Sequence, residues 1–186
     1  MFKKILLVIV GLVAVLAVVI QFQPSTFSVT RTTTIGAPAE KVFELVNDFH
    51  NWEKWSPWTK LDPNIKTTYS GSPSGNGAIF SWTGNQAVGE GKMTITSSEP
   101  STHIGIRLEF IKPFASAAQN DFTFTSNSGA TEVSWNMSGE NNFLSKAFCL
   151  FMGGMEKIIG PDFEKGLAQM KSVADAKTLG RQEIKN

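Results

Sequence analysis

Hydrophobic and polar positions follow three different patterns along this chain, and each pattern predicts a different element. Residues 5–20 are apolar throughout except for Gly11. Residues 27–35 (FSVTRTTTI) are rich in β-branched side chains and alternate in character, which predicts a strand. Residues 38–48 place apolar side chains at spacings of three and four, which predicts a short amphipathic helix beginning near Pro38.

Residues 65–139 alternate between strand-like segments and turn-forming residues. The expected strands cover residues 65–70, 78–83, 88–97, 103–111, 118–125 and 131–138. Because the connections between them are short and rich in Gly, Pro, Asn and Ser, we expect antiparallel pairing. One face of these strands is bulky and apolar and the other is polar, so the apolar face needs a cover.

The C-terminal part of the chain supplies that cover. Its apolar positions recur at helical spacing and are Phe148, Phe151, Met155, Ile158, Ile159, Phe163, Leu167, Met170 and Val173. Because Gly153-Gly154 and Gly160-Pro161 interrupt the run, we expect a short helix over residues 143–152 and a long helix over residues 161–177. The predicted fold is therefore α+β, a curved antiparallel sheet of about seven strands wrapped around a long C-terminal helix.

The N-terminal apolar run is just long enough to cross a membrane, which takes roughly 20 residues. We expect residues 1–22 to form an uncleaved transmembrane signal anchor, followed by a linker at 23–26, the domain at 27–177 and a polar tail at 178–186. A cleaved signal peptide and a buried core helix are the alternatives. Because Lys3 and Lys4 precede the run and the next basic residue is Arg31, the N-terminus is expected in the cytoplasm and the domain on the extracytoplasmic side.

Composition excludes several classes of function. The 17 basic and 16 acidic residues become 15 and 16 once Lys3 and Lys4 are set aside, so the domain is near neutral and unsuited to binding a nucleic-acid backbone. Cys149 is the only cysteine, and His50 and His103 are the only histidines. An internal disulfide is impossible, and neither a metal site nor a cofactor is expected.

Several motifs resemble the helix-grip fold of the START/SRPBCC superfamily, and in particular its bacterial polyketide cyclase/dehydrase-like or lipid-transport-like members with an N-terminal membrane anchor. The motifs are Ile35-Gly36-Ala37-Pro38-Ala39-Glu40-Lys41-Val42-Phe43, Trp52-Glu53-Lys54-Trp55-Ser56-Pro57-Trp58, Tyr69-Ser70-Gly71 and Gly160-Pro161-Asp162-Phe163-Glu164-Lys165-Gly166-Leu167. The resemblance covers about residues 27–177. It implies a domain whose sheet and helix enclose a space for an apolar ligand, but it places no catalytic residue in this chain.

Candidate catalytic residues are few. Cys149 lies among apolar neighbours and is interpreted as a buried structural thiol, and His103 as a surface residue. His50 follows the first short helix, and it is interpreted either as an ordinary loop residue or as a residue that contacts the ligand. Arg31 shares the parity of Val29, so it either reaches solvent or faces the interior, where it would hold a carboxylate or phosphate headgroup.

Three hypotheses for function remain open. The first is a membrane-tethered binding or carrier domain for a hydrophobic small molecule or lipid, the second a cyclase/dehydratase-type enzyme using the same cavity, and the third a non-catalytic accessory subunit of a membrane complex. The absence of an acid–base pair favours binding, and any protein partner is unknown. The expected ligand-binding residues are Trp55, Trp58, Phe80, Trp82, Phe110, Phe122, Phe124, Trp135, Phe163, Leu167 and Met170.

Two alternatives apply to this aromatic set, because the same side chains would also make an ordinary packed core. If a cavity exists, we expect Trp55 and Trp58 to close one of its ends. We also expect the loop at residues 71–77 to be mobile, since its sequence lacks apolar side chains that would pin it.

Overall fold

The structure is a computed structural model that describes residues 1–183, with side chains described through residue 176. In chain order its elements are α1 (Phe2–Gln21), β1 (Thr26–Ile35), α2 (Ala39–Asn47), the 3₁₀ helix η1 (Phe49–Lys54), β2 (Lys66–Gly71), β3 (Ala78–Thr83), β4 (Glu90–Glu99), β5 (His103–Lys112), β6 (Ser116–Asn127), β7 (Ala130–Glu140), α3 (Phe143–Met152) and α4 (Met155–Glu183). The predicted α+β class and strand order are confirmed.

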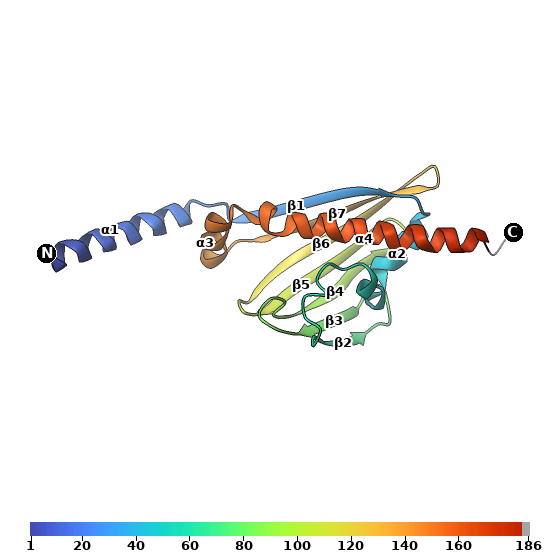
Figure 1. Ribbon diagram of the computed structural model, residues 1–186, viewed down its shortest axis with the longest axis horizontal. Coiled ribbons are helices and arrows are strands. Elements are labelled where there is room, and N and C mark those ends of the chain that lie inside the picture. Colours follow the sequence, from blue (N-terminus) through green and yellow to red (C-terminus); the bar gives the residue numbers. More distant parts are fainter. Residues whose placement is uncertain (184–186) are drawn as a thin grey trace.

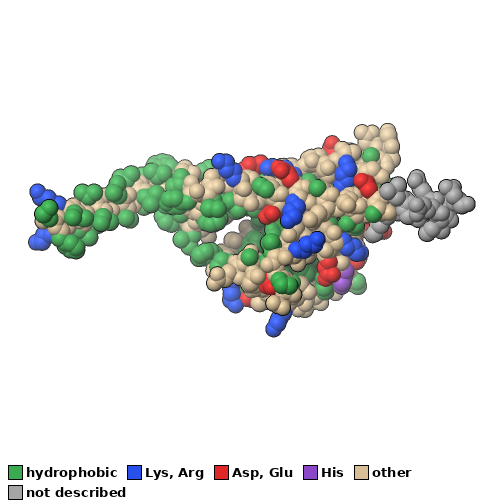
Figure 2. Space-filling view, viewed as in Figure 1, with side chains coloured by type: hydrophobic (Ala, Val, Ile, Leu, Met, Phe, Trp, Pro, Cys, Tyr) green, Lys and Arg blue, Asp and Glu red, His purple; other side chains and the backbone are tan. Residues whose placement is uncertain are grey.

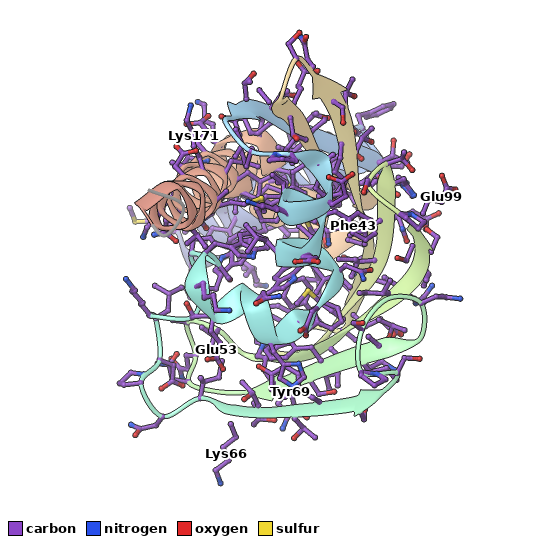
Figure 3. The ribbon with its side chains drawn as sticks, turned by 90° about the vertical axis from the view of Figure 1, so that its right-hand side faces the viewer. Phe43, Glu53, Lys66, Tyr69, Glu99 and Lys171 are labelled. Atoms are coloured by element: carbon purple, nitrogen blue, oxygen red, sulfur yellow. The ribbon has the colours of Figure 1, made fainter. Side chains whose placement is uncertain are left out.

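The seven strands form one antiparallel sheet in the order β1-β7-β6-β5-β4-β3-β2. Every neighbouring pair except β1 and β7 is consecutive in the chain, as short turns require. The sheet curves around α4, α2 and η1, which lie on its concave side (Figures 1 and 3). This is the helix-grip arrangement, with the first strand closing the sheet against the last.

The alternation predicted from the sequence determines which face is buried. On β7, Val133, Trp135 and Met137 are buried, whereas the residues between them lie on the wet face. Trp135 pairs with Phe122 of β6, so two large rings stand side by side on the concave face. Phe163, Leu167 and Met170 of α4 are buried against this part of the sheet. The predicted convergence of the sheet and the long helix is confirmed here.

The long helix begins earlier than predicted. We expected Gly160-Pro161 to separate two segments, but α4 is continuous from Met155 and contains Pro161 in its interior. It also runs past residue 177 to Glu183, so most of the expected polar tail is helical, and residues 184–186 lie outside the described residues.

A long-range ion pair on the surface spans Pro161. Arg31 of β1 donates to Glu156 from Nη1 (2.6 Å) and to Glu164 from Nε (2.7 Å), so one guanidinium contacts the helix before and after the proline. A side chain at Gly160 would collide with this guanidinium, so glycine lets Arg31 lie across the helix. Of the two positions expected for Arg31, the structure shows the surface one, where its side chain joins β1 to α4.

The short helix α3 forms where it was predicted but does not cover the sheet. Asn142 caps it by accepting a hydrogen bond from the backbone of Ser145, and Gly153 ends it in the left-handed conformation. None of its residues is buried. Phe148 and Phe151, which we expected to face the sheet, are exposed because α3 lies beside the end of α1 rather than over the sheet (Figure 1).

The glycine-rich loop at residues 71–77 is tied down by its backbone. The amide of Gly75 donates to the carbonyl of Asn47, and the amide of Gly77 donates to the carbonyl of Ile95. These bonds replace the apolar contacts that the sequence lacks. We therefore no longer expect a mobile loop.

In hydrogen exchange, the Gly75 and Gly77 amides should be protected like those of the neighbouring strands, and exchange at the rate of a free peptide would contradict this.

At its N-terminus the chain has one helix, α1, that is long and apolar enough to cross a membrane. It extends away from the domain, and almost all of its side chains are exposed (Figure 1). A buried core helix, one of the alternatives considered for this segment, is therefore excluded.

Candidate functional site

A cavity of about 550 Å³ lies on the concave side of the sheet. α4 packs mainly against the β1 end of the sheet, whereas β2 to β5 curve away from it and leave the space open. The wall is completed by η1 and the segment that follows it. The lining residues are Phe49, Trp52, Glu53, Ser56, Trp58, Thr59, Lys60, Ile65, Thr67, Tyr69, Phe80, Trp82, Ala87, Val88, Met93, Leu108, Phe110, Asn120, Trp135, Met137 and Phe163.

The aromatic side chains of the wall are held rigidly by one another. Trp135 stacks on Phe163 of α4 with ring centroids 3.9 Å apart, and Trp58 meets both rings edge-on. On the opposite wall Phe80 stacks on Trp82, whose indole N–H donates to the carbonyl of Val88 at 2.9 Å. A wall preorganised in this way loses little conformational entropy when an apolar ligand binds.

The structure divides the predicted ligand-binding residues into two groups. Six of them line the cavity, namely Trp58, Phe80, Trp82, Phe110, Trp135 and Phe163. The other five lie in the packed core beside it, namely Trp55, Phe122, Phe124, Leu167 and Met170. Trp55, for example, is fully buried and donates its indole N–H to the carbonyl of Leu45, so Trp58 rather than Trp55 faces the space.

Other wall residues were missing from the predicted set. Met93, Leu108 and Met137 share the apolar face that alternation assigned correctly, but aliphatic side chains carry no signal that separates wall from core. Asn120 did carry a signal. It shares the parity of Phe122 and is a polar residue at an apolar position, which marks a buried polar group with a specific partner.

The deepest polar group of the wall is this Asn120, which is buried. Its Oδ1 accepts a hydrogen bond from the indole N–H of Trp135 at 3.1 Å. The amide Nδ2 has two further protons to donate, which suits a carbonyl, carboxyl or hydroxyl oxygen of a ligand. The cavity is thus mainly apolar, and the buried polar side chains of its wall are Asn120 and Ser56.

The titratable side chains of the wall are Glu53, Lys60 and Tyr69. Glu53 and Lys60 are exposed, which places them at the rim. The hydroxyl of Tyr69 donates to Oε1 of Glu53 at 3.3 Å, joining β2 to η1 across the edge of the cavity (Figure 3). The ring of His50 stacks on the Tyr69 ring, with centroids 4.0 Å apart.

This rim contact predicts a measurable titration. Partial burial, and then the negative charge of Glu53, raise the pKa of Tyr69 above its ordinary value of 10.0. Tyr69 is the only tyrosine, so tyrosinate absorbance reports it alone, and its midpoint should lie above 10. Because the pKa of Tyr69 is higher in the folded than in the unfolded protein, the protonated phenol contributes to the free energy of unfolding. This contribution is complete below the unfolded-state pKa and is lost as the pH rises through the folded-state pKa.

Glu53→Gln should lower that midpoint toward the ordinary value, because it removes the charge but not the burial. Glu99→Gln, an exposed carboxylate on β4, serves as the control and should leave the midpoint unchanged. An unshifted tyrosine in the wild type would contradict the packing of Tyr69 against η1.

The remaining candidates lie outside the cavity. His50 lies in a smaller hollow of about 140 Å³ beside it, with Nδ1 2.7 Å from Oδ1 of Asp48. His103 lies on the wet face, 3.0 Å from Asp121, which agrees with the surface position expected for it. Cys149 was expected to be buried, and it is only partly buried. This partial burial still raises the pKa of its thiol, whereas a nucleophilic cysteine needs a lowered pKa. Residues 1–176 contain no cluster of acidic, His and Cys side chains suited to a metal ion.

Comparison with known proteins agrees with this geometry. Residues 26–175 match the model of the family described as polyketide cyclase / dehydrase and lipid transport. No curated protein matches the sequence.

Solved structures share the fold at low identity. Protein MLL2253 from Mesorhizobium loti is 18% identical with a TM-score of 0.57, over 81% of this chain and 98% of that one. The Zhui aromatase/cyclase from Streptomyces sp. R1128 is 13% identical with a TM-score of 0.57, over 82% and 96%. The di-domain aromatase/cyclase StfQ of the steffimycin biosynthetic pathway is 9% identical with a TM-score of 0.59, over 83% and 52%.

At these identities the solved structures support the fold alone, while the family model covers most of the chain. The motifs that resemble the START/SRPBCC superfamily lie at the β1–α2 junction, in η1 and the segment after it, in β2 and in α4. The chain belongs to the polyketide cyclase/dehydrase and lipid transport family, as a helix-grip domain preceded by an apolar helix.

Proposed function

We propose that this protein binds a hydrophobic small molecule or lipid in the cavity between the sheet and α4, as a binding or carrier domain tethered to a membrane. The observation that carries the proposal is a 550 Å³ space whose wall is mainly aromatic and aliphatic. Ligand cavities in proteins have about this size and composition, roughly 300–1,000 Å³ with a few polar groups. A filled core would leave no such space.

The distribution of polar groups favours binding over catalysis. General acid–base chemistry needs a titratable group within hydrogen-bond reach of the reacting atom. Here Glu53 and Lys60 lie at the rim with Tyr69, and the buried polar groups of the wall, the amide of Asn120 and the hydroxyl of Ser56, are neutral. That amide orients a ligand without exchanging protons with it.

A cyclase- or dehydratase-type reaction is the second candidate. The family description supports it, and so does the Tyr69–Glu53 contact, which brings a phenol and a carboxylate to the cavity edge. A ligand long enough to reach from Asn120 to this rim would touch both. Conversion of a bound poly-β-carbonyl substrate, lost in Tyr69→Phe but not in His103→Gln, would favour this candidate over simple binding.

The tether in this proposal is α1. Its 20 residues reach about 30 Å at 1.5 Å per residue, the thickness of the hydrocarbon core of a bilayer. We infer an uncleaved anchor with Lys3 and Lys4 in the cytoplasm and the domain at 27–177 on the other side. A mature N-terminus located after residue 17 would contradict the anchor while leaving the cavity unaffected.

The experiment is mass spectrometry of organic extracts from the full-length protein, purified into lipid nanodiscs to avoid detergent in the cavity. Lipids around α1 will be present in every sample, so the wild type is compared with Leu108→Trp, which places an indole in the cavity. We expect a hydrophobic compound that is enriched in the wild type in near-stoichiometric amount. Identical extracts, together with no binding of a fluorescent fatty acid, would reject the proposal.

A further inference from the structure

An apolar surface on α3 faces away from the domain. Five large side chains of this helix are between 48% and 71% exposed, namely Phe143, Leu144, Phe148, Phe151 and Met152. At 100° per residue they fall within one half of the helix circumference, whereas Lys146 and Cys149 lie on the other half. A water-exposed helix rarely keeps so many large apolar groups together unless something covers them.

The position of α3 indicates what covers it. The Nζ atom of Lys146 donates to the carbonyl of Gln21, the last residue of α1, at 3.2 Å. The residue before the α3 cap, Asn141, bonds through its backbone amide to Ser25 at 2.8 Å and through its side chain to Pro24 at 3.2 Å. α3 therefore lies at the point where the candidate membrane span ends (Figure 1).

A second apolar group lies at the same end of the sheet. Ile111 and Phe114, in the β5–β6 hairpin, are also exposed. Ala118 of β6 pairs with Gly139 near the end of β7, so this hairpin is beside the point where the chain leaves the sheet for α3. Figure 2 shows the hydrophobic surface of α1 continuing onto the neighbouring end of the domain.

We propose that α3 lies in the interfacial layer of the lipid bilayer, with its exposed apolar face among the acyl chains and Phe114 beside it. The proposal rests on α1 being a membrane anchor, as in the proposed function. α3 has ten residues and reaches about 15 Å, too short to span a membrane but suited to lying along its surface. Lys146 is its one charged residue and faces α1 rather than the apolar side.

Lipid fits this face better than a second copy of the chain or another protein. The apolar face continues the exposed surface of α1, and any membrane that holds α1 brings lipid to the level of Gln21. A protein partner would have to reach the same face within the interfacial layer. Continuity with the anchor therefore assigns the covering to lipid.

The placement also orients the cavity. Phe110, Trp82 and Val88 line its end nearest the β5–β6 hairpin, where Lys112 pairs with Glu90 at 2.7 Å. The surface is hollowed next to this apolar end of the domain (Figure 2). With α3 in the interface, this end of the cavity faces the bilayer, so a membrane-dissolved ligand has a short path into it.

The test uses nitroxide labels on the full-length protein in phosphatidylcholine nanodiscs. Cys149→Ser removes the single cysteine, and new single cysteines replace Leu144, Phe148 or Phe151 in turn. Electron paramagnetic resonance then compares collisions with oxygen, which concentrates in lipid, and with a water-soluble nickel chelate. Val13→Cys in α1 is the lipid control, and Thr125→Cys, at the far end of β6, is the water control.

We expect the three α3 labels to resemble Val13, with high oxygen and low nickel accessibility. Nickel accessibility as high as at Thr125 would overturn the proposal in favour of a water-exposed helix. Low accessibility to both reagents would overturn it in favour of a protein partner. If Val13 itself were accessible to nickel, the anchor and this proposal would fail together.

Measuring ligand binding on the same variants tests the carrier function separately from the interfacial position of α3. The α3 residues do not line the cavity, so every labelled variant should bind a fluorescent fatty acid as the wild type does. If the labels lie in lipid but the wild type binds no probe, the carrier function is rejected and the interfacial helix stands. If the probe binds but the labels are in water, only the interfacial helix is rejected.

Discussion

Trp135→Ala should destabilise the domain by about 3–5 kcal/mol, the range for loss of a packed aromatic side chain. Trp135 is buried between the rings of Phe163 and Phe122, whose centroids lie 3.9 Å and 4.9 Å from its own. Truncation therefore removes the ring that joins α4 to the sheet. It also leaves the buried oxygen of Asn120 without its donor. Urea unfolding in mild detergent, followed by circular dichroism, measures the change.

Two control variants separate the causes of that loss. Trp135→Phe keeps a ring in the stack but removes the indole N–H, so its cost should be about 1–3 kcal/mol, that of an unsatisfied buried acceptor. Glu132→Ala, on the wet face of the same strand, should change the free energy of unfolding by less than about 0.5 kcal/mol. If Trp135→Ala costs no more than Glu132→Ala, the ring stack does not hold α4.

The sheet and its buried face were predictable because alternation is a local property. Each strand of β3 to β7 shows a period of two in its own residues, and short turns leave antiparallel pairing as the only simple solution. The position of the long helix followed from the need to cover that face. Strand boundaries shifted by at most two residues, as expected when hydrogen bonding rather than composition decides where a strand ends.

The ends and surroundings of the C-terminal helices were not predictable in the same way. Pro161 indicated a helix start, but Arg31, about 130 residues earlier in the chain, pairs with glutamates on both sides of it. The apolar side chains of α3 predicted a cover for the sheet. Periodicity says that a helix face is apolar but not whether protein or lipid covers it.

The division between cavity wall and core also depends on tertiary structure. Phe122 and Trp82 share the apolar face of one sheet, yet Phe122 is in the core and Trp82 lines the cavity. The difference arises because α4 covers the β1 end of the sheet and not the β2 end. The sequence carries no signal for that offset, so it predicted the aromatic set but not its division.

Leu108→Trp should abolish binding of a fluorescent fatty acid, with at least a tenfold loss of affinity, about 1.4 kcal/mol. Leu108 lines the cavity from the middle of β5, between Met93 and Ala118 on the neighbouring strands. An indole at this position extends into space that the ligand would occupy. Overpacking a filled core typically costs about 1–3 kcal/mol. If the cavity is open, the larger side chain fits without this loss of stability.

Arg107→Trp is the matched control, because it adds the same ring to the same strand one residue away, on the wet face. Its affinity for the probe should equal that of the wild type. Titration of probe fluorescence and urea unfolding are measured on both variants. Retained binding in a stable Leu108→Trp would show that the probe binds elsewhere, on α1 or α3. Lost binding with a stability loss of several kcal/mol would point to a filled core, because an open cavity admits the indole while a packed one is broken by it.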